Sequence, residues 1–483
     1  MNYKVILNVL GKVLFIVSAL LCLPIIVALI YGEYSDIIGF VIPVGILLLL
    51  GCLTLLIKLE DKNIYAKEGF VIVSLVWIVL SLIGSLPFVI NGYIPNYVDA
   101  LFETVSGFTT TGSSILDSNQ IESLSMSCSF WRSFTHFIGG MGVLVFVLAV
   151  LPQYNNGVMH LFKAESPGPT ASKFVGKMKR TARILYGIYC VLTLIEIIML
   201  LFGGMNVFDS IVHAFSTAGT GGFSNKGASI AYYDSVYIEV VIATFMFLFG
   251  VNFNVFYLIL IGQFRKAICS EELRVYFIVV LLAVVLIALD LISVYGNFAT
   301  ALRYSYFQTT AISSTTGFVT ADFDAWPNFS KSILLLLMIL GGCGGSTCGG
   351  FKISRALILG KTTFADLKRI TKHRAVISTK FEGEILSQET INTARLFMFL
   401  WIIIVFVSTL LLSLEGTDIL TNLTASLTCI SNVGPALSKV GPSLNFAFFS
   451  PYSKILLSLV MLAGRLEIIP LVILFNPKTW KKN

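Results

Sequence analysis

Long apolar runs fill most of the chain, and the polar segments between them recur in a fixed order. The first two runs, at 13–31 and 37–57, are each long enough to cross a bilayer as a helix. After them one unit occurs four times: an apolar run, a half-length segment, a polar stretch ending in glycine, and a second apolar run. The pattern therefore predicts two leading transmembrane helices and four repeats. The first run has no small-x-small cleavage site and a second span follows at once, so we expect it to be retained.

The half-length segments predict that part of the chain enters the membrane without crossing it. The half-length segments lie at 97–108, 207–218, 299–313 and 418–430. The apolar runs before them lie at 69–90, 184–205, 275–296 and 396–416. The apolar runs after them lie at 130–151, 236–262, 332–351 and 453–475. A helix of about 12 residues is about 18 Å long, which is roughly half of a hydrocarbon core of about 30 Å. Non-helical backbone at that depth must be buried in protein or line a cavity. Each unit is therefore predicted to be a span, a re-entrant half-helix and a second span.

The polar stretches carry the candidate chemistry, because backbone carbonyls arranged in rings can replace the hydration shell of a potassium ion. The predicted filter residues, with the glycine last in each triplet, are Thr110, Thr111, Gly112, Thr220, Gly221, Gly222, Thr315, Thr316, Gly317, Asn432, Val433 and Gly434. Glycine adopts backbone angles that other residues avoid and allows close approach of neighbouring chains. One such glycine would be explained as a turn or a helix-packing residue. Four in register, each after a half-length segment, favour a potassium filter around one axis.

The repeats divide the chain into five parts. Residues 1–67 hold the leading helices, 68–182 the first repeat with Gly112, 183–273 the second with Gly222, 274–387 the third with Gly317, and 388–483 the fourth with Gly434. The predicted fold is an all-α polytopic membrane protein with the four repeats in a pseudo-fourfold arrangement around one pore.

Composition and charge support a membrane location and set the topology. The chain is 56% hydrophobic and only 12% charged, with a mean hydropathy of +0.88. Its formal charge of +7 comes from basic residues in short loops at 163–180, 265–274 and 352–374 and in the tail at 478–482, which indicates a positive-inside pattern and not nucleic-acid binding. Ten predicted spans place both termini on one side, the cytoplasmic one, and the glycine stretches face outward. The eight cysteines show neither zinc spacing nor a disulfide framework.

The second span of the third repeat has an unusual glycine content. Six glycines fall within 341–350, and each costs about 1 kcal/mol of helix propensity. The functional interpretation is an unwound loop that obstructs the pore below the filter, and the alternative is close helix packing at GxxxG spacing. The predicted gate residues in this loop are Gly341, Gly342, Gly344, Gly345, Ser346, Thr347, Gly349 and Gly350.

Charged and polar groups inside the spans are the remaining candidates. Arg465 stands in the middle of a span, where a charge is costly unless it faces the protein interior or a wet cavity. It either forms an ion pair, with Glu467 as the nearest partner, or belongs to the gate, where it binds loop carbonyls and raises a barrier to cations. Glu103, His213 and Gln308 stand nine positions before the glycine of their repeats, and we expect them to brace the filter from behind.

These features together resemble the TrkH family, the membrane subunits of bacterial Trk potassium-uptake systems, in the superfamily that includes the Ktr and plant HKT transporters. The resemblance covers essentially the whole chain. It implies a potassium-selective pore within one polypeptide, an intramembrane gating loop at 341–350 and a gating role for Arg465. Members selective for sodium tend to have serine where Gly112 stands, so potassium is favoured. Each repeat has one aligned glycine in place of the longer TVGYG filter sequence of tetrameric potassium channels, so fewer or less uniform ion sites are expected.

The resemblance also implies partners and a location. We expect a homodimer in the bacterial inner membrane that binds a cytosolic ring of TrkA-like, nucleotide-binding subunits. This chain has no P-loop, so the nucleotide is expected on the partner, and potassium in the filter is the only ligand predicted here. The basic segment 352–380 is a candidate docking surface, and topology-setting charge explains it equally well.

The sequence predicts a transporter and not an enzyme. No GxSxG motif occurs, and the four histidines are far apart with no metal spacing. The predicted function is potassium uptake through a gated, channel-like pore that also passes rubidium, driven by the membrane potential and regulated by the cytosolic subunit. The alternative is a symporter that moves potassium with protons or sodium by alternating access. Such folds typically use inverted or twofold repeats, whereas four repeats in one orientation suit an axial pore.

Overall fold

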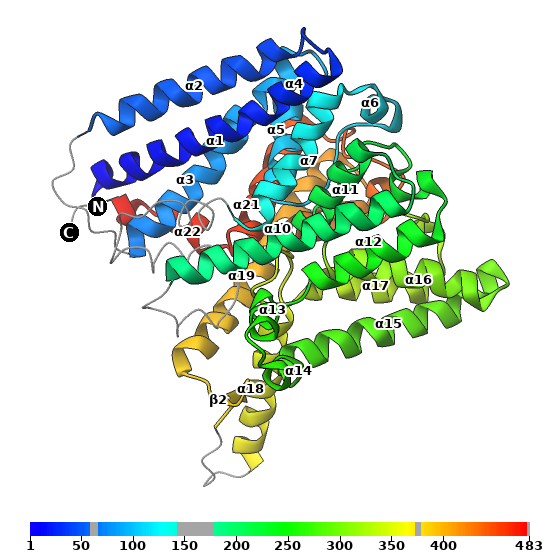
Figure 1. The fold of residues 1–483 in the computed structure, drawn as a ribbon. Coiled ribbons are helices and arrows are strands. Elements are labelled where there is room, and N and C mark those ends of the chain that lie inside the picture. The colour runs from blue at the N-terminus through cyan, green and yellow to red at the C-terminus, as the bar shows by residue number, and fades with distance from the viewer. Residues whose placement is uncertain (58–65, 143–177, 372–377, 481–483) are drawn as a thin grey trace.

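The computed structural model describes residues 1–57, 66–142, 178–371 and 378–480. Within these ranges the chain is helical, except for connecting segments and one short hairpin, β1 (Lys380–Phe381) paired antiparallel with β2 (Glu384–Ile385). The helices form one bundle, from which the hairpin and a single helix project at one end (Figure 1).

The two leading helices pack side by side at the edge of the bundle (Figure 1). They are α1 (Tyr3–Tyr31) and α2 (Ile37–Leu55). The first begins ten residues before the predicted apolar run, because the Asn2 side chain caps it by accepting a hydrogen bond from the Val5 amide. A Cβ atom on Gly11 would overlap the Thr54 hydroxyl, so the two helices are in very close contact there.

The half-helices match the prediction to within one residue at each end. They are α5 (Tyr97–Phe108), α11 (Val207–Gly219), α16 (Phe298–Ser313) and α20 (Ile419–Ser431). Each starts at a capping side chain, Asn96, Asn206, Asn297 or Asp418, which accepts a backbone hydrogen bond of the first turn. At Asp418, the hydrogen bond from the Thr421 hydroxyl holds the pKa of the carboxyl below its usual range.

The first helices of the repeats are long. The first repeat begins with α3 (Ala66–Gly84), which continues after one residue as α4 (Leu86–Ile90), and the others begin with α10 (Met178–Phe202), α15 (Glu271–Tyr295) and α19 (Gln388–Leu412). Large apolar side chains are exposed along the outer faces of α10, α15 and α19. Such faces suit contact with lipid, as expected for a polytopic membrane protein.

The second helices are α7 (Met126–Gly140); α12 (Val236–Phe249) with α13 (Phe253–Leu260), bent by 91°; α17 (Asn328–Leu340); and α21 (Pro451–Arg465) with α22 (Ile469–Phe475). Those of the second and fourth repeats are interrupted, so the prediction of one unbroken span is wrong there. In the third repeat α17 ends at Leu340, where the unwound loop is predicted. In the described residues, six helices are long and apolar enough to cross a membrane, or seven if the bent pair counts as one. The predicted run 130–151 extends beyond the described residues.

Glycine and left-handed residues mark these interruptions. The break in the second repeat begins at Gly250, and in the fourth repeat Glu467 and Ile468 have φ angles of 58° and 65°. Such residues cannot continue an α-helix. Hydropathy alone does not register these breaks.

Shorter elements complete the fold. They are α6 (Ser118–Ser123), α14 (Phe264–Ile268), α18 (Ile353–Thr371), η2 (Ser229–Tyr233), η3 (Phe323–Ala325), η4 (Ser413–Glu415), η5 (Ser438–Val440) and η6 (Pro477–Trp480). Helix α18 is the one that projects from the bundle together with the hairpin (Figure 1).

The two ends of the chain meet. The Tyr3 ring stacks on Trp480 with 6.0 Å between ring centroids, and its hydroxyl donates to the Trp480 carbonyl at 2.7 Å. The ends therefore lie on the same side of the bundle, in agreement with the prediction. Their cytoplasmic location stays a prediction, and the basic segments at 163–177 and 481–482, on which it partly rests, lie outside the described residues.

Candidate functional site: a closed ring of four glycine strands

The residues 110–112, 220–222, 315–317 and 432–434, here called the four ring strands, lie around one axis. A Cβ atom built on the glycine of any strand would overlap the carbonyl oxygen that precedes the glycine in the next strand. The pairs are Gly112 with Gly221, Gly222 with Thr316, Gly317 with Val433, and Gly434 with Thr111. The contacts run from repeat 1 through 2, 3 and 4 and back to 1. The structure thus brings all twelve predicted filter residues into a closed ring.

The four strands share one backbone conformation. The glycines have φ angles of 79°, 77°, 77° and 100° in Gly112, Gly222, Gly317 and Gly434. Two positions earlier, Thr110, Thr220, Thr315 and Asn432 have φ angles of 54°, 56°, 55° and 53°. A β-branched residue in the left-handed region is strained, and such strain persists only where the surroundings impose it. The repeats are therefore equivalent in conformation as well as in sequence pattern.

A helix C-cap explains the left-handed residue. In every repeat, the amide of the residue just before the glycine donates to the carbonyl six positions before the glycine. The bonds are Thr111 to Ser106 at 2.9 Å, Gly221 to Ser216 at 2.9 Å, Thr316 to Ala311 at 2.9 Å and Val433 to Thr428 at 3.1 Å. In the first three repeats the preceding amide also bonds one turn back, as in a Schellman motif. Each half-helix therefore ends directly at its ring strand, and its partial negative charge lies beside the ring.

The residues nine positions before the glycines hold the strands from behind, as predicted. Glu103 accepts hydrogen bonds from the Ser114 hydroxyl at 2.9 Å and the Ile115 amide at 2.9 Å. His213 Nε2 lies 2.9 Å from the Ser224 hydroxyl. In the third repeat, Gln308 Nε2 donates to the Thr320 hydroxyl at 3.3 Å. Each contact ties a half-helix to the chain that leaves its ring strand.

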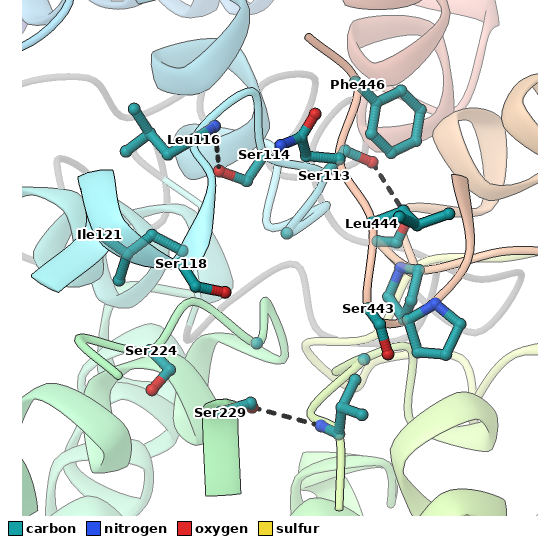
Figure 2. A pocket seen from close by; sticks show the side chains of 18 of the residues that line it. Ser113, Ser114, Leu116, Ser118, Ile121, Ser224, Ser229, Ser443, Leu444 and Phe446 are labelled. Carbon is teal, nitrogen blue, oxygen red and sulfur yellow. Dashed lines mark hydrogen bonds between the residues drawn. The ribbon is translucent and has the colours of Figure 1, made fainter. Parts of the chain in front are cut away.

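A cavity opens on one side of the ring. It has a volume of about 550 Å³, and its lining includes the glycine of every strand. Serine side chains surround it, among them Ser113, Ser114, Ser224 and Ser443 (Figure 2). The Ser113 hydroxyl donates to the Gly434 carbonyl at 3.2 Å, which links the first and fourth strands (Figure 2). A hydrated ion entering here would meet polar groups before it meets the ring.

The glycine-rich segment 341–352 lies against the ring strands and is not helical, as its composition predicts. The Gly349 amide donates to the Thr315 hydroxyl at 2.8 Å, and a Cβ atom on Gly349 would overlap the Ser431 carbonyl. The other end of the segment is tied to the break in the second repeat, since the Cys343 amide donates to the Gly250 carbonyl at 3.0 Å. The segment thus connects three repeats.

Two residues that the sequence analysis did not single out hold this segment. Glu272 of α15 is buried and accepts hydrogen bonds from the Gly344 amide at 2.6 Å and the Ser354 amide at 3.1 Å. The Lys352 ammonium donates to the Cys348 carbonyl. Both residues stand at the edges of predicted spans, where charged residues are ordinary, so nothing in the sequence distinguished them.

Arg465 bridges the segment and the first repeat. It donates to the Thr347 carbonyl at 2.7 Å and to the Gly140 carbonyl at 2.7 Å, and also to the Gly139 carbonyl. The predicted contact with carbonyls of the loop is therefore present. Glu467, the partner named in the alternative, pairs with Arg355, with 2.5 Å between Nη2 of the arginine and Oε2 of the glutamate.

In the described ranges, no group of three or more histidine, cysteine or acidic residues is placed to hold a metal ion. The site is built from backbone carbonyls and hydroxyls, which are ligands for hard cations such as potassium and sodium.

Comparisons with known proteins agree with this architecture. The family model TrkH, described as a cation transport protein, matches residues 44–482. The Trk system potassium uptake protein TrkH of Salmonella typhimurium is 35% identical over 489 residues, with 100% of both chains covered. The Trk system potassium uptake protein TrkG of Escherichia coli K12 is 31% identical, with 99% of both covered. The crystal structure of the potassium transporter TrkH from Vibrio parahaemolyticus matches with a TM-score of 0.90 at 31% identity, and 100% of each chain is covered.

Proposed function

Because the chain belongs to the TrkH family, we propose that it is the membrane subunit of a Trk-type system and carries potassium into a bacterial cell across the inner membrane. The observation that carries this proposal is the closed ring of four strands with equivalent backbones. Backbone carbonyls in such a ring replace water around a dehydrated ion. The four half-helix ends add partial negative charge beside it.

The ring residues are the proposed potassium site. The ligands are carbonyls of the twelve residues of the ring strands, and those of Thr111, Gly221, Thr316 and Val433 lie closest to the neighbouring glycines. Rubidium has the same charge and a similar size, so it passes as well. The membrane potential drives inward flow with about 2.3 kcal/mol per charge per 100 mV.

The segment 341–352 and Arg465 form the proposed gate. The segment lies against the ring strands, and the guanidinium bonds to its Thr347 carbonyl. A fixed positive charge near the path of the ion raises an electrostatic barrier to cations. Opening then requires the segment to move and the contacts of Arg465 to change.

The proposal also covers regulation and assembly. We infer a homodimer that binds a cytosolic, TrkA-like nucleotide-binding subunit, because the relatives are named as parts of a Trk system. Helix α18 follows directly after the proposed gate and projects from the bundle (Figure 1). Its basic residues Lys368 and Arg369 lie in its last turn. The predicted docking surface 352–380 includes this helix, and its residues 372–377 lie outside the described ranges.

A symporter working by alternating access is the second candidate. A rocking mechanism needs two groups of helices that move against each other around the site. Here every ring strand contacts the next one around the whole circle, which favours a continuous pore.

Uptake of rubidium-86 into potassium-loaded liposomes containing the purified protein tests the proposal. We expect external potassium to block uptake and sodium to block it only weakly. Equal block by both ions would point to a non-selective cation pore. Uptake that requires an inward proton or sodium gradient would favour the symporter.

A further inference from the structure

A buried ion pair lies within the first repeat behind the ring, and its arginine also bonds to the second repeat. Arg132 lies on α7 and Glu103 on α5, and 2.7 Å separates Nε of the arginine from Oε1 of the glutamate. The two residues are 4% and 1% exposed. A buried pair of this kind is stable only when its remaining donors and acceptors are also bonded.

The remaining atoms of the pair bond to the chain that leaves two neighbouring ring strands. Glu103 accepts from the Ser114 hydroxyl at 2.9 Å, and Arg132 Nη1 donates to the Ser224 carbonyl at 2.9 Å. Arg132 Nη2 also donates to the Ser114 hydroxyl at 3.2 Å. Ser114 and Ser224 each stand two residues after the glycine of their strand. One guanidinium thus ties the first strand to the second.

Two aromatic rings fix this arrangement next to the second strand. The Arg132 guanidinium carbon lies 3.6 Å from the centroid of the Phe223 ring, a close cation–π contact. The His136 ring stacks on Phe223 with 4.1 Å between centroids. A Cβ atom on Gly221 would overlap the His136 ring. This overlap explains why the second strand has glycine before its last residue, where the other strands have a side chain.

The helix position of Arg132 is charged in the first repeat and apolar in the other three. Arg132 is the seventh residue of its helix, and the seventh residues of the other second helices are apolar: Ile242, Leu334 and Leu457. The ion pairs at two other repeat boundaries, Arg303 with Glu239 and Lys454 with Asp99, involve other positions of the second helices.

We propose that Arg132 is a positioning residue that determines ion selectivity by fixing the gap between the first and second ring strands. The inference rests on the proposed function of the ring as a potassium site. Selectivity depends on the number and placement of carbonyl dipoles around the ion. The planar guanidinium holds Glu103, Ser114 and Ser224 at once, so the ends of both strands are held at one separation. When that bridge is weakened, the strands approach a smaller ion more easily and sodium competes better.

The test is the substitution Arg132→Lys in the full-length protein. Lysine keeps the charge but lacks the planar fork that reaches several acceptors. Rubidium-86 uptake into liposomes is measured with potassium or sodium as competitor. In the protein that is recovered folded, we expect the ratio of the half-inhibitory concentrations of sodium and potassium to fall about tenfold. A merely structural role would lower the amount of active protein and leave that ratio unchanged.

Arg303→Lys is the matched control. Arg303 of α16 pairs with Glu239 of α12 at 2.6 Å and so joins neighbouring repeats. Its partners Asp234 and Glu239 stand 12 and 17 residues after Gly222, whereas Ser114 and Ser224 stand two residues after the glycine of their strands. We expect its competition ratio to equal that of the wild type. An unchanged ratio in Arg132→Lys, or an equal fall in Arg303→Lys, would overturn the inference.

Phe223→Leu decides the question if Arg132→Lys is not recovered as a folded protein. This change removes the ring against which the guanidinium lies and keeps both charges. A lowered ratio supports the inference and a wild-type ratio rejects it. A wild-type protein without potassium-selective uptake would instead refute the proposed function of the ring, so the two failures are distinguishable.

Discussion

At the residue scale, the ring depends on positions where a side chain has no room. The glycine of each ring strand combines a positive φ angle with contact to the carbonyl of the next strand. The first property makes any other residue strained, by about 1–2 kcal/mol. The second makes a larger residue displace a carbonyl of the proposed ion site. Only the second property bears on transport.

Gly222→Ala separates these two effects when it is compared with Gly262→Ala. Gly262 also has a positive φ angle, 75°, but among the described residues nothing lies within 4 Å of its Cβ position. We expect Gly222→Ala to reduce rubidium uptake about tenfold or more, equivalent to at least about 1.4 kcal/mol in the barrier. Gly262→Ala should keep uptake close to that of the wild type. Equal uptake by the two variants would contradict the proposed site.

Arg465→Ala tests the barrier at the gate. The guanidinium donates to carbonyls of two repeats, and in the proposed gate its charge opposes the entry of cations. Its removal should raise potassium-selective flux about tenfold, as expected for a barrier lowered by about 1.4 kcal/mol. Arg465→Lys keeps the charge and should stay near the wild-type rate. A normally expressed Arg465→Ala protein with unchanged or slower flux would reject the role.

At the element scale, the interrupted second helices determine what lies beside the ring. The segment between α17 and α18 crosses to the break between α12 and α13, where the Phe253 amide donates to the Gly345 carbonyl at 3.0 Å. Glu272 then fixes the segment and the start of α18 together. A displacement of α18 is therefore transmitted to the proposed gate through few contacts.

Glu272→Gln should loosen the gate segment. Hydrogen bonds to a charged acceptor contribute about 1.5–3 kcal/mol each, more than those to a neutral one, and this carboxylate accepts two from the segment and from α18. We expect higher basal uptake without a partner subunit, about tenfold or less. Glu271→Gln is the control, since that neighbour pairs at the surface with Lys361, and exposed pairs contribute little. Basal uptake that is no higher in Glu272→Gln than in Glu271→Gln would show that the segment does not obstruct the pore.

At the scale of the whole molecule, four repeats of one chain build a single axis. Each repeat contributes one strand, one half-helix end and one cap of the same geometry. The similar backbones approximate fourfold symmetry, while the side chains differ from repeat to repeat. Such an axis suits passage of one ion at a time along the ring, driven by the electrical potential.

The dependence on voltage follows from this architecture. A uniport of potassium should accumulate rubidium about tenfold for each 60 mV of imposed potential, since 100 mV supplies about 2.3 kcal/mol per charge. Proton or sodium gradients without a potential should add nothing. To check this, the final ratio of internal to external rubidium is measured at several membrane potentials. Each potential is set with an ionophore other than valinomycin. A steeper dependence, or a shift with the pH gradient, would indicate a coupled ion and favour the symporter.

Local signals in the sequence were sufficient for much of the fold. The half-helices match the prediction to within one residue, because each is a short segment that ends at a polar glycine stretch. The Asn or Asp that caps the start of each is a further local signal, which the prediction did not use. The unwound stretch at 341–350 followed from helix propensity. Arg132 stood inside a predicted span and was not considered, although a charge at that depth is itself a signal.

The contacts between distant parts of the chain could be identified only in the tertiary structure. The 91° bend after Gly250 leaves the hydropathy of its segment unchanged, so the sequence pattern predicts an unbroken span there. The order of the ring, and the choice of Gly139, Gly140 and Thr347 as acceptors for Arg465, depend on segments more than 90 residues apart. Composition and periodicity indicate whether each segment prefers water or the membrane and whether it can be helical, and these properties are local. Which carbonyl faces which strand is decided only when four repeats pack around a common axis.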